Sequence, residues 1–336
     1  MTSFRDDEWD EFVRAHPAAT FFHHSAWRHV ASGVFGHRPH FLDVRRNGNL
    51  AAVLPLVEVR SRFFGHALIS NAYCVGGGPL AIDESALSQI LDQAEELGRR
   101  LRVDYVELRD TQYAKAGWTR QEELYAGFEG PLPFSEEDNL KQIPRKQRAV
   151  VRKALGRGLT VTIETSPDAF FPLYARTMRD HGTPALPRRY FQRLLRVFGA
   201  DCEILTVSEG GRPVSSVLSY FFGDRVMPYY TGCRPEARRL GSNDLMYWAL
   251  MRRAVSRGCS IFDFGRSKVG AGPYGFKVNW GFEPRPIANY YRLITAADLP
   301  EVNPANPKYA GLIQAWRRLP IPVATALSPV LSRGLG

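Results

Sequence analysis

The chain has 336 residues, more than one ordinary compact domain holds, so we expect two domains. Its 44% hydrophobic and 23% charged residues are typical of a globular protein and exclude a disordered chain. A formal net charge of +10 favours anionic partners such as nucleotides, coenzyme A, tRNA, acidic lipids or glycans, although arginine used only for solubility gives the same charge.

The first half of the chain predicts an α/β unit with a hairpin. The patterns predict helices at 7–14 and 25–33, strands at 40–45, 50–59 and 67–71, a helix at 85–101 and a strand at 105–109. Ser25 is the expected N-cap of the second helix. Asn47-Gly48 between two apolar runs is a strong signal for a tight β-hairpin.

A basic segment follows at 136–157, and its pattern predicts a helix broken early at Pro144. It carries seven cations: Lys141, Arg145, Lys146, Arg148, Arg152, Lys153 and Arg157. A solvated helix face is the default interpretation. The alternatives are contact with tRNA phosphates or with an acidic membrane surface.

The pattern of the first half then returns. We expect a strand at 159–164, helices at 167–178 and 188–198, strands at 202–208, 213–222 and 225–232, a helix at 243–257 and a strand at 261–264. This is a tandem duplication of pattern without a repeat of residues. We place the domains at 1–135 and 136–299.

A Pro-rich tail occupies 300–336, and no helical period is clear in it. Trp316-Arg317-Arg318 and the apolar residues up to Leu331 are a combination that can lie on a membrane surface. The alternative, which we favour, is a strap packed on the body of the protein.

The expected compartment follows from the cysteines and the N-terminus. None of the four cysteines has CxxC spacing, and residues 1–12 are acidic and helix-like rather than a signal peptide. The apolar run at 50–59 is too short to span a bilayer. We therefore expect a cytoplasmic protein, at the inner face of the membrane if the tail binds lipid.

A loop with the chemistry of an anion cradle precedes the helix at 243–257. The first-turn N–H groups of a helix have no internal partners, glycine allows close approach, and arginine adds positive charge. The residues with these properties are Arg238, Arg239, Gly241, Ser242 and Asn243. An ordinary helix cap on the surface is the alternative.

Two motifs in this half resemble known families. The run 238–243 resembles the R/Q-x-x-G-x-G/A loop with which GNAT acyltransferases hold the coenzyme A pyrophosphate, although Asn243 takes the last position. Phe262-Asp263-Phe264-Gly265, followed by Tyr274-Gly275-Phe276-Lys277-Val278-Asn279-Trp280-Gly281, resembles the C-terminal signature of the FemAB family. The resemblance is closest to FemAB-related proteins associated with exosortase (PEP-CTERM) and exopolysaccharide loci, and 21–27, 75–79 and 179–184 look like further landmarks.

The resemblance implies a fold and an activity. The fold would be α/β, with two tandem GNAT-like domains of mixed sheets flanked by helices, which agrees with the repeated pattern. The enzyme would transfer an acyl or aminoacyl group to an amine of a cell-envelope or exopolysaccharide precursor. Its partners would be an anionic donor, acyl-CoA or aminoacyl-tRNA, and a glycan or envelope acceptor, with no tightly bound cofactor and no DNA.

The resemblance also implies residue roles. Lys277 is the candidate that stabilises the oxyanion of the tetrahedral transition state. The general base stays open among Asp263, His181, Asp244 and the tyrosines. Candidate substrate-binding residues are Tyr229, Tyr230, Arg266, Ser267, Lys268, Tyr274 and Phe276. We expect Trp280 and Phe282 in the core.

Other signals point away from rival functions. The run 270–275 has GxGxxG spacing, but Pro273 and the following residues predict a flexible loop over the site rather than a Rossmann turn. Seven of the eight histidines lie in the first half without metal-ligand spacing, and G-x-S-x-G is absent. We therefore expect neither a metal site nor a serine hydrolase. A non-catalytic scaffold in exopolysaccharide or protein-sorting machinery is the alternative to an enzyme.

Overall fold

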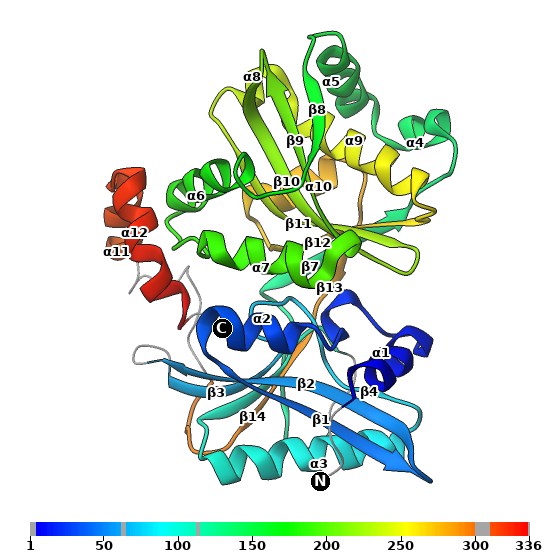
Figure 1. Cartoon of the computed structure of the whole chain (residues 1–336), viewed down its shortest axis with the longest axis vertical. Coiled ribbons are helices and arrows are strands. Elements are labelled where there is room, and N and C mark those ends of the chain that lie inside the picture. Colours follow the sequence, from blue (N-terminus) through cyan, green and yellow to red (C-terminus); the bar gives the residue numbers. More distant parts are fainter. Residues whose placement is uncertain (1–4, 62–64, 112–114, 300–309, 335–336) are drawn as a thin grey trace. The chain divides into compact units, whose positions relative to one another are not determined.

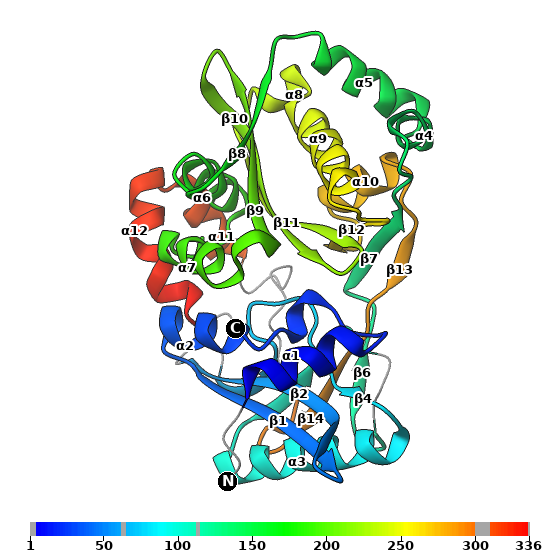
Figure 2. The ribbon, with the colours of Figure 1, turned by 45° about the vertical axis from the view of Figure 1, so that its right-hand side comes forward.

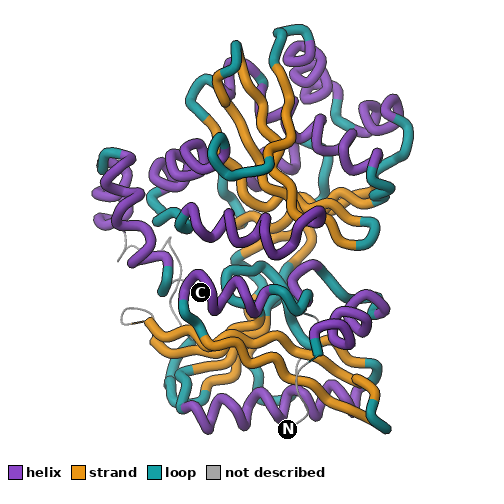
Figure 3. Tube along the Cα trace, viewed as in Figure 1, coloured by secondary structure: helices purple, strands orange, loops and turns teal. Residues whose placement is uncertain are grey.

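The computed structural model describes residues 5–61, 65–111, 115–299 and 310–334. The chain forms two compact units: the first comprises 1–124, 286–303 and 333–336, and the second comprises 125–285 and 304–332. Each unit is built on a seven-stranded mixed sheet with helices on both faces (Figures 1 and 3). The expected α/β architecture with two mixed sheets is confirmed.

The sheet of the first unit has the strand order β1-β2-β3-β5-β14-β6, and β4 pairs with β2. Only β3 and β5 are parallel among the registered pairs. The strands are β1 (Arg38–Arg46), β2 (Asn49–Ser61), β3 (Gly65–Ser70), β4 (Leu80–Ala81), β5 (Tyr105–Leu108), β6 (Thr119–Gln121) and β14 (Asn289–Leu293). The predicted hairpin is confirmed, because Asn47 and Gly48 both have positive φ between β1 and β2.

Helix α3 (Glu84–Leu101) packs on one face of this sheet. The other face carries α1 (Asp6–Ala15), the 3₁₀ turn η1 (Phe21–His23) and α2 (Trp27–Phe35) (Figure 1). Strand β2, next to the edge strand β1, is buried on both faces, with Leu54 and Leu56 toward α3 and Val57 and Val59 in the opposite core. This explains its nearly continuous apolar sequence.

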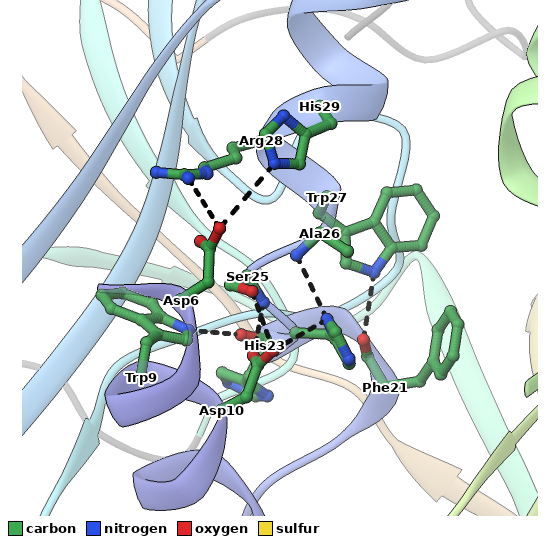
Figure 4. A network of polar contacts seen from close by, with 11 residues as sticks. Asp6, Trp9, Asp10, Phe21, His23, Ser25, Ala26, Trp27, Arg28 and His29 are labelled. Atoms are coloured by element: carbon green, nitrogen blue, oxygen red, sulfur yellow. Dashed lines mark hydrogen bonds and ion pairs between the residues drawn. The ribbon is translucent and has the colours of Figure 1, made fainter. Parts of the chain in front are cut away.

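A polar network joins α1, η1 and α2 (Figure 4). The Asp10 carboxylate accepts hydrogen bonds from the amide and the hydroxyl of Ser25, both at 2.8 Å. The indole N–H groups of Trp9 and Trp27 donate to the carbonyls of His23 and Phe21 at 2.7 and 3.0 Å. The prediction of Ser25 as an N-cap is wrong: α2 starts at Trp27, and the Ser25 side chain binds the neighbouring helix instead.

The sheet of the second unit has the order β13-β7-β12-β11-β10-β9-β8, in which only β11 and β12 are parallel among the registered pairs. Its strands are β7 (Tyr125–Pro131), β8 (Thr160–Glu164), β9 (Cys202–Glu209), β10 (Arg212–Phe222), β11 (Arg225–Cys233), β12 (Ile261–Lys268) and β13 (Pro284–Pro286). The strands expected from the sequence between 159 and 264 are all present.

Helices cover both faces of this sheet. Figure 2 shows α6 (Phe170–His181) and α7 (Arg188–Phe198) on one face, and α9 (Ser242–Ser256) and α10 (Gly272–Asn279) on the other. The basic segment forms α4 (Glu136–Gln142) and α5 (Arg145–Leu155), broken at Pro144 as predicted, and α5 packs on α9. Two short elements complete the unit: η2 (Gly199–Asp201) and α8 (Ala237–Leu240).

Each sheet takes a strand from a distant part of the chain. Strand β7 pairs with β12, whereas β14, which follows the whole of the second sheet in sequence, is inserted between β5 and β6. The compact units therefore divide the chain after Leu124 and again after Arg285, where the expected boundaries were Ser135 and residue 299.

The described part of the tail is helical. Helices α11 (Ala310–Arg318) and α12 (Ile321–Ser332) both pack against α6, which agrees with the strap interpretation, while 300–309 lie outside the described residues. None of the helices in the described ranges combines the length and the apolar character that crossing a bilayer requires.

Candidate active site

The parallel strands β11 and β12 separate soon after they start. They pair only at Arg225↔Ile261 and Val226↔Phe262, although β11 continues to Cys233 and β12 to Lys268. Beyond these two pairs the two strands no longer pair through backbone hydrogen bonds. A split of this kind exposes backbone donors and acceptors in the middle of a sheet, where a ligand can bind them.

A bulge at Gly265 shapes the β12 side of the split. Gly265 has φ +68°, and the register with β7 shifts between Asp263 and Gly265. Successive carbonyls of a regular strand point in opposite directions. The bulge changes this, so that the Lys277 ammonium donates to the carbonyls of both Gly265 and Arg266, at 3.1 and 3.0 Å.

The Lys277 side chain is buried, with only 8% of the residue exposed. Its ammonium lies over the rings of Phe128 and Phe264, 5.3 and 5.6 Å from the ring centroids. Burial lowers the pKa of Lys277 to about 8, against a smaller opposing effect of Asp263. An ammonium has three N–H donors, and two are used on carbonyls. The third has no hydrogen-bond partner among the described residues.

Lys277 is carried by α10, which starts inside the run 270–275 for which the sequence predicted a flexible loop. That prediction is wrong, because Pro273 falls in the first turn of α10, where a missing N–H and a fixed φ cost little. The helix is held by rings from three elements. Tyr247 of α9 contacts Phe264, Phe276 and Trp280, with its centroid 4.7 Å from that of Phe264.

Asp244, in the first turn of α9, fixes the end of α10. Its carboxylate accepts a hydrogen bond from the Trp280 indole at 3.1 Å and another from the Gln147 amide of α5. Burial raises the pKa of Asp244. From the sequence, Asp244 was expected only as a candidate base and Trp280 as a core residue. Trp280 is indeed buried, but its hydrogen bond to Asp244, 36 residues away in the sequence, could not be predicted from any sequence pattern.

Asp263 lies on β12 directly before the bulge, and its carboxylate accepts the Gly265 amide hydrogen at 2.8 Å. Burial raises the pKa of Asp263 to about 6; the Gly265 hydrogen bond opposes this, and the charge of Glu129 on β7 adds to it. Asp263 is the charged group that acts on the pKa of Lys277. The Asp263 carboxylate therefore favours the charged form of Lys277, against the larger effect of burial.

The Asp263→Asn variant tests the cost of this partly buried charge through stability. Because the pKa of Asp263 is raised in the folded state, the charged form costs stability at pH 7, and that cost disappears as the pH falls from about 6 to 4. The introduced side chain is neutral and keeps an oxygen for the Gly265 amide. We expect the variant to be stabilised by up to about 3 kcal/mol at pH 7 and not at pH 4, measured by urea unfolding.

The exposed Asp7→Asn variant is the control and should leave stability unchanged at both pH values. A loss of stability at pH 7 on changing Asp263 would show that its charge is compensated in the folded protein.

The remaining predicted residues of β12 and α10 lie on the same two elements as Asp263 and Lys277. The Arg266 guanidinium lies over the Tyr125 ring at 4.3 Å, and the Tyr274 ring meets Phe128 edge-on at 5.2 Å. The Ser267 hydroxyl is buried without a hydrogen-bond partner in the described part of the chain. Phe276 packs in the aromatic core, and Lys268 ends the strand.

Three predicted residues, Tyr229, Tyr230 and His181, lie with α6 and α7, on the face of the second sheet opposite to α9 and α10. The Tyr230 ring packs against Tyr174 of α6 and Tyr190 of α7, and it accepts or donates a hydroxyl hydrogen bond with Tyr190 at 3.0 Å. A register shift in the β10–β11 pair brings Tyr229 next to it. His181 ends α6, where burial lowers its pKa and Arg317 of α11 donates to its carbonyl.

The predicted anion cradle lies at the junction of α8 and α9. Gly241 has φ +67° and lies against α5, so that a Cβ there would be 3.2 Å from Val150. The Ser242 hydroxyl and the Asn243 amide oxygen both hydrogen-bond to the Ser215 hydroxyl of β10 at 2.6 and 2.8 Å. These two side chains therefore hold the junction together.

The positive charge of this junction comes from three exposed arginines: Arg238, Arg239 and Arg157. The Arg157 guanidinium donates to the Arg239 carbonyl, which brings α5 to the loop. Neither Arg238 nor Arg239 has an ion-pair partner within the described ranges. Elsewhere in those ranges, no group of three or more His, Cys, Asp or Glu side chains could hold a metal ion.

Comparison with known proteins agrees with this architecture. The family model described as an acetyltransferase (GNAT) domain matches residues 139–278, which include the split, the cradle and Lys277. The structure of FemX is similar with a TM-score of 0.69 and 17% identity, over 86% of this chain and 96% of that chain. The chain has a tandem GNAT-like fold.

Two further structures support this fold. L-PGS from Bacillus licheniformis is similar with a TM-score of 0.53 and 14% identity, over 99% of this chain and 97% of that one. A tandem GNAT protein from the clavulanic acid biosynthesis pathway has the same TM-score and identity, over 87% of this chain and 94% of that one. No curated protein matches the sequence.

Proposed function

We propose that this GNAT-fold protein is an N-acyltransferase that moves an acyl or aminoacyl group onto an amine of a cell-envelope or exopolysaccharide precursor in the cytoplasm. One observation carries the proposal: a buried ammonium, that of Lys277, is fixed by two carbonyls beside a split in the sheet and keeps a third N–H donor unused by the described residues. Burying an ammonium costs stability, and proteins accept such a cost where charge is needed.

The chemistry would be attack of an amine on a thioester or ester carbonyl. A C–N bond forms, the carbonyl oxygen becomes negative, and collapse of the tetrahedral intermediate breaks the C–S or C–O bond. The Lys277 N–H stabilises the negative oxygen. In this proposal Asp263, which is ionised above its pKa of about 6, acts as the general base and accepts the proton of the attacking amine. The leaving group takes a proton from solvent.

The donor fits coenzyme A best. GNAT acyltransferases use acyl-CoA as a co-substrate without a tightly bound cofactor, and the matched domain includes the junction where Arg157, Arg238 and Arg239 gather. Arginine binds phosphate through paired N–H donors. We therefore propose that these arginines hold the coenzyme A phosphates, while Ser242 and Asn243 shape the loop.

The Arg239→Glu variant tests the donor. Removing a cation and adding an anion beside the phosphates should weaken CoA binding by at least about tenfold in calorimetry. Arg196→Glu is the matched control, because Arg196 is an exposed arginine of α7 and the change in net charge is the same. If both variants weakened CoA binding equally, the effect would come from net charge alone, and the placement of Arg239 at the CoA phosphates would be contradicted.

Aminoacyl-tRNA is the alternative donor, and the basic face of α5 favours it. Exposed cations on or beside that helix are Arg145, Lys146, Arg152, Lys153 and Arg157. The affinity for charged tRNA in filter binding would then fall steeply as salt rises. It would also fall to the same extent for different tRNA species when Lys146 and Arg152 are changed to glutamine.

The acceptor would be identified by product. Purified protein is incubated with acetyl-CoA or charged tRNA and with a panel of nucleotide-activated amino sugars and amine-bearing envelope precursors, and amide products are sought by mass spectrometry. A new amide that requires the protein supports the proposal. Binding of neither donor, together with no product, would overturn it in favour of a non-catalytic scaffold.

A further inference from the structure

Helix α12 packs against its unit with its small residues. Ala324, Ser328 and Ser332 recur every four residues and are buried. On the opposite side Val323, Leu327 and Val330 form an apolar row in which Val330 is 77% exposed. A helix of a soluble protein normally buries its apolar row. Here the apolar row faces outward.

Hydrogen bonds fix this orientation. The amide of Ala185, in the loop that joins α6 and α7, donates to the Ser328 hydroxyl at 3.0 Å, and that hydroxyl donates to the Ala324 carbonyl at 2.7 Å. Rolling the helix to bury Val330 would break the first bond and leave a buried amide unpaired. The exposed row is therefore part of the folded structure.

The segment that carries the row is positively charged. In α11, Leu312 is 69% exposed, and the exposed Arg317 and Arg318 lie shortly before α12 in the sequence. The stretch from 310 to 332 contains no Asp or Glu. An exposed apolar row on a segment with two arginines and no acidic residue complements a bilayer that contains anionic lipid.

A pocket of about 520 Å³ lies on the flank of the same helix, between α6 and α12. Its walls are largely apolar and include Phe171, Ile321 and Pro322, and it is lined by two cations, Arg176 and Arg234. Arg176 has no ion-pair partner in the described part of the chain. Apolar walls with two guanidinium groups suit a phosphate attached to an apolar body.

We propose that α11 and α12 dock on the surface of an anionic bilayer, with the apolar row among the acyl chains and one lipid headgroup phosphate in the pocket between α6 and α12. A helix of 12 residues is about 18 Å long and lies on the membrane rather than crossing it. The proposal goes beyond the transfer reaction and does not depend on Lys277.

Vesicle flotation of the full chain tests the proposal. We expect binding to vesicles of phosphatidylglycerol and phosphatidylcholine, no binding to phosphatidylcholine alone, and weaker binding as salt rises. Val330→Asp should weaken binding by more than about tenfold, because the charge would enter the acyl region. Ile82→Asp, which changes a 59% exposed residue of the first unit, is the matched control and should bind like the wild type.

The pocket is tested separately with Arg176→Gln, for which we expect about fivefold weaker vesicle binding. Calorimetry with inorganic phosphate separates two sources of the ligand: saturable binding of millimolar phosphate that Arg176→Gln abolishes, together with vesicle binding that Arg176→Gln leaves unchanged, indicates a free-phosphate site and overturns the lipid assignment. Absence of vesicle binding, or equal loss in Val330→Asp and Ile82→Asp, overturns the docking surface. Concentration-dependent dimerisation that Val330→Asp abolishes, without vesicle binding, would assign the row to a second copy of the chain and overturn the bilayer as its occupant.

Discussion

Changing Lys277 to methionine is expected to lower the rate of acyl transfer by about 10²–10³-fold, the usual cost of losing one oxyanion donor. Methionine fills a similar volume among Phe128 and Phe264 but cannot donate to the carbonyls of Gly265 and Arg266 or to a substrate oxygen. Single-turnover transfer, with donor binding measured in parallel, separates this effect from loss of affinity. Undiminished turnover would refute the role of Lys277.

The same variant should not unfold the protein. Burial lowers the pKa of Lys277 to about 8, so between that value and its ordinary pKa the unfolded chain binds more protons. The charged lysine therefore costs stability at pH 7, and wild-type stability rises with pH above about 8. We expect Lys277→Met to be stabilised by up to about 3 kcal/mol at pH 7, less the two hydrogen bonds it loses. A large drop in melting temperature would give Lys277 a structural role instead.

The pH profile provides a second readout. Transfer needs the Lys277 ammonium, which is lost above about pH 8, and the Asp263 carboxylate, which is lost below about pH 6. The rate should therefore be bell-shaped between these values. Lys277→Arg keeps a cation at high pH, and we expect it to restore part of the activity and to move the alkaline limb upward. An unchanged alkaline limb in the arginine variant would assign that limb to another group.

Local patterns predicted the parts of this fold that local physics decides. Asn47-Gly48 predicted the first hairpin because only a few residues tolerate two positive φ values in succession. The long helices and buried strands followed from periodicity. The motif around Lys277 identified this residue as a candidate. The motif could not show that Lys277 is buried beside a split in the sheet.

The parts that failed depend on distant partners. Strands β7 and β14 lie in the sheets because of partners far away in the sequence, and no local signal announces such pairing. Helix α10 was missed because Pro273 was taken as a breaker, whereas in a first turn it is tolerated. The bond between Asp244 and Trp280, and the packing of Phe128 under Lys277, likewise exist only once the elements have met.

The fold explains why position 232 is a glycine, which the sequence alone did not explain. It lies in β11, against α6, and a Cβ built there would overlap the Tyr174 amide nitrogen and the Leu173 carbonyl carbon and lie 2.6 Å from the Tyr174 Cα. Next to it, the Thr177 hydroxyl of α6 accepts the Cys233 amide hydrogen at 3.0 Å. The backbones of helix and strand therefore touch at this point.

Gly232→Ala is expected to destabilise the second unit by at least about 3 kcal/mol, because the new methyl group meets backbone, which cannot rotate away as a side chain can. Relief requires α6 to move off the sheet, which breaks the packing of Tyr174 on Tyr230. Denaturant unfolding measures the loss. Gly275→Ala is the matched control: that glycine lies within α10 with open space around its Cβ position, and the helix should gain up to about 1 kcal/mol. Similar stability of the two variants would mean that α6 tolerates displacement from β11.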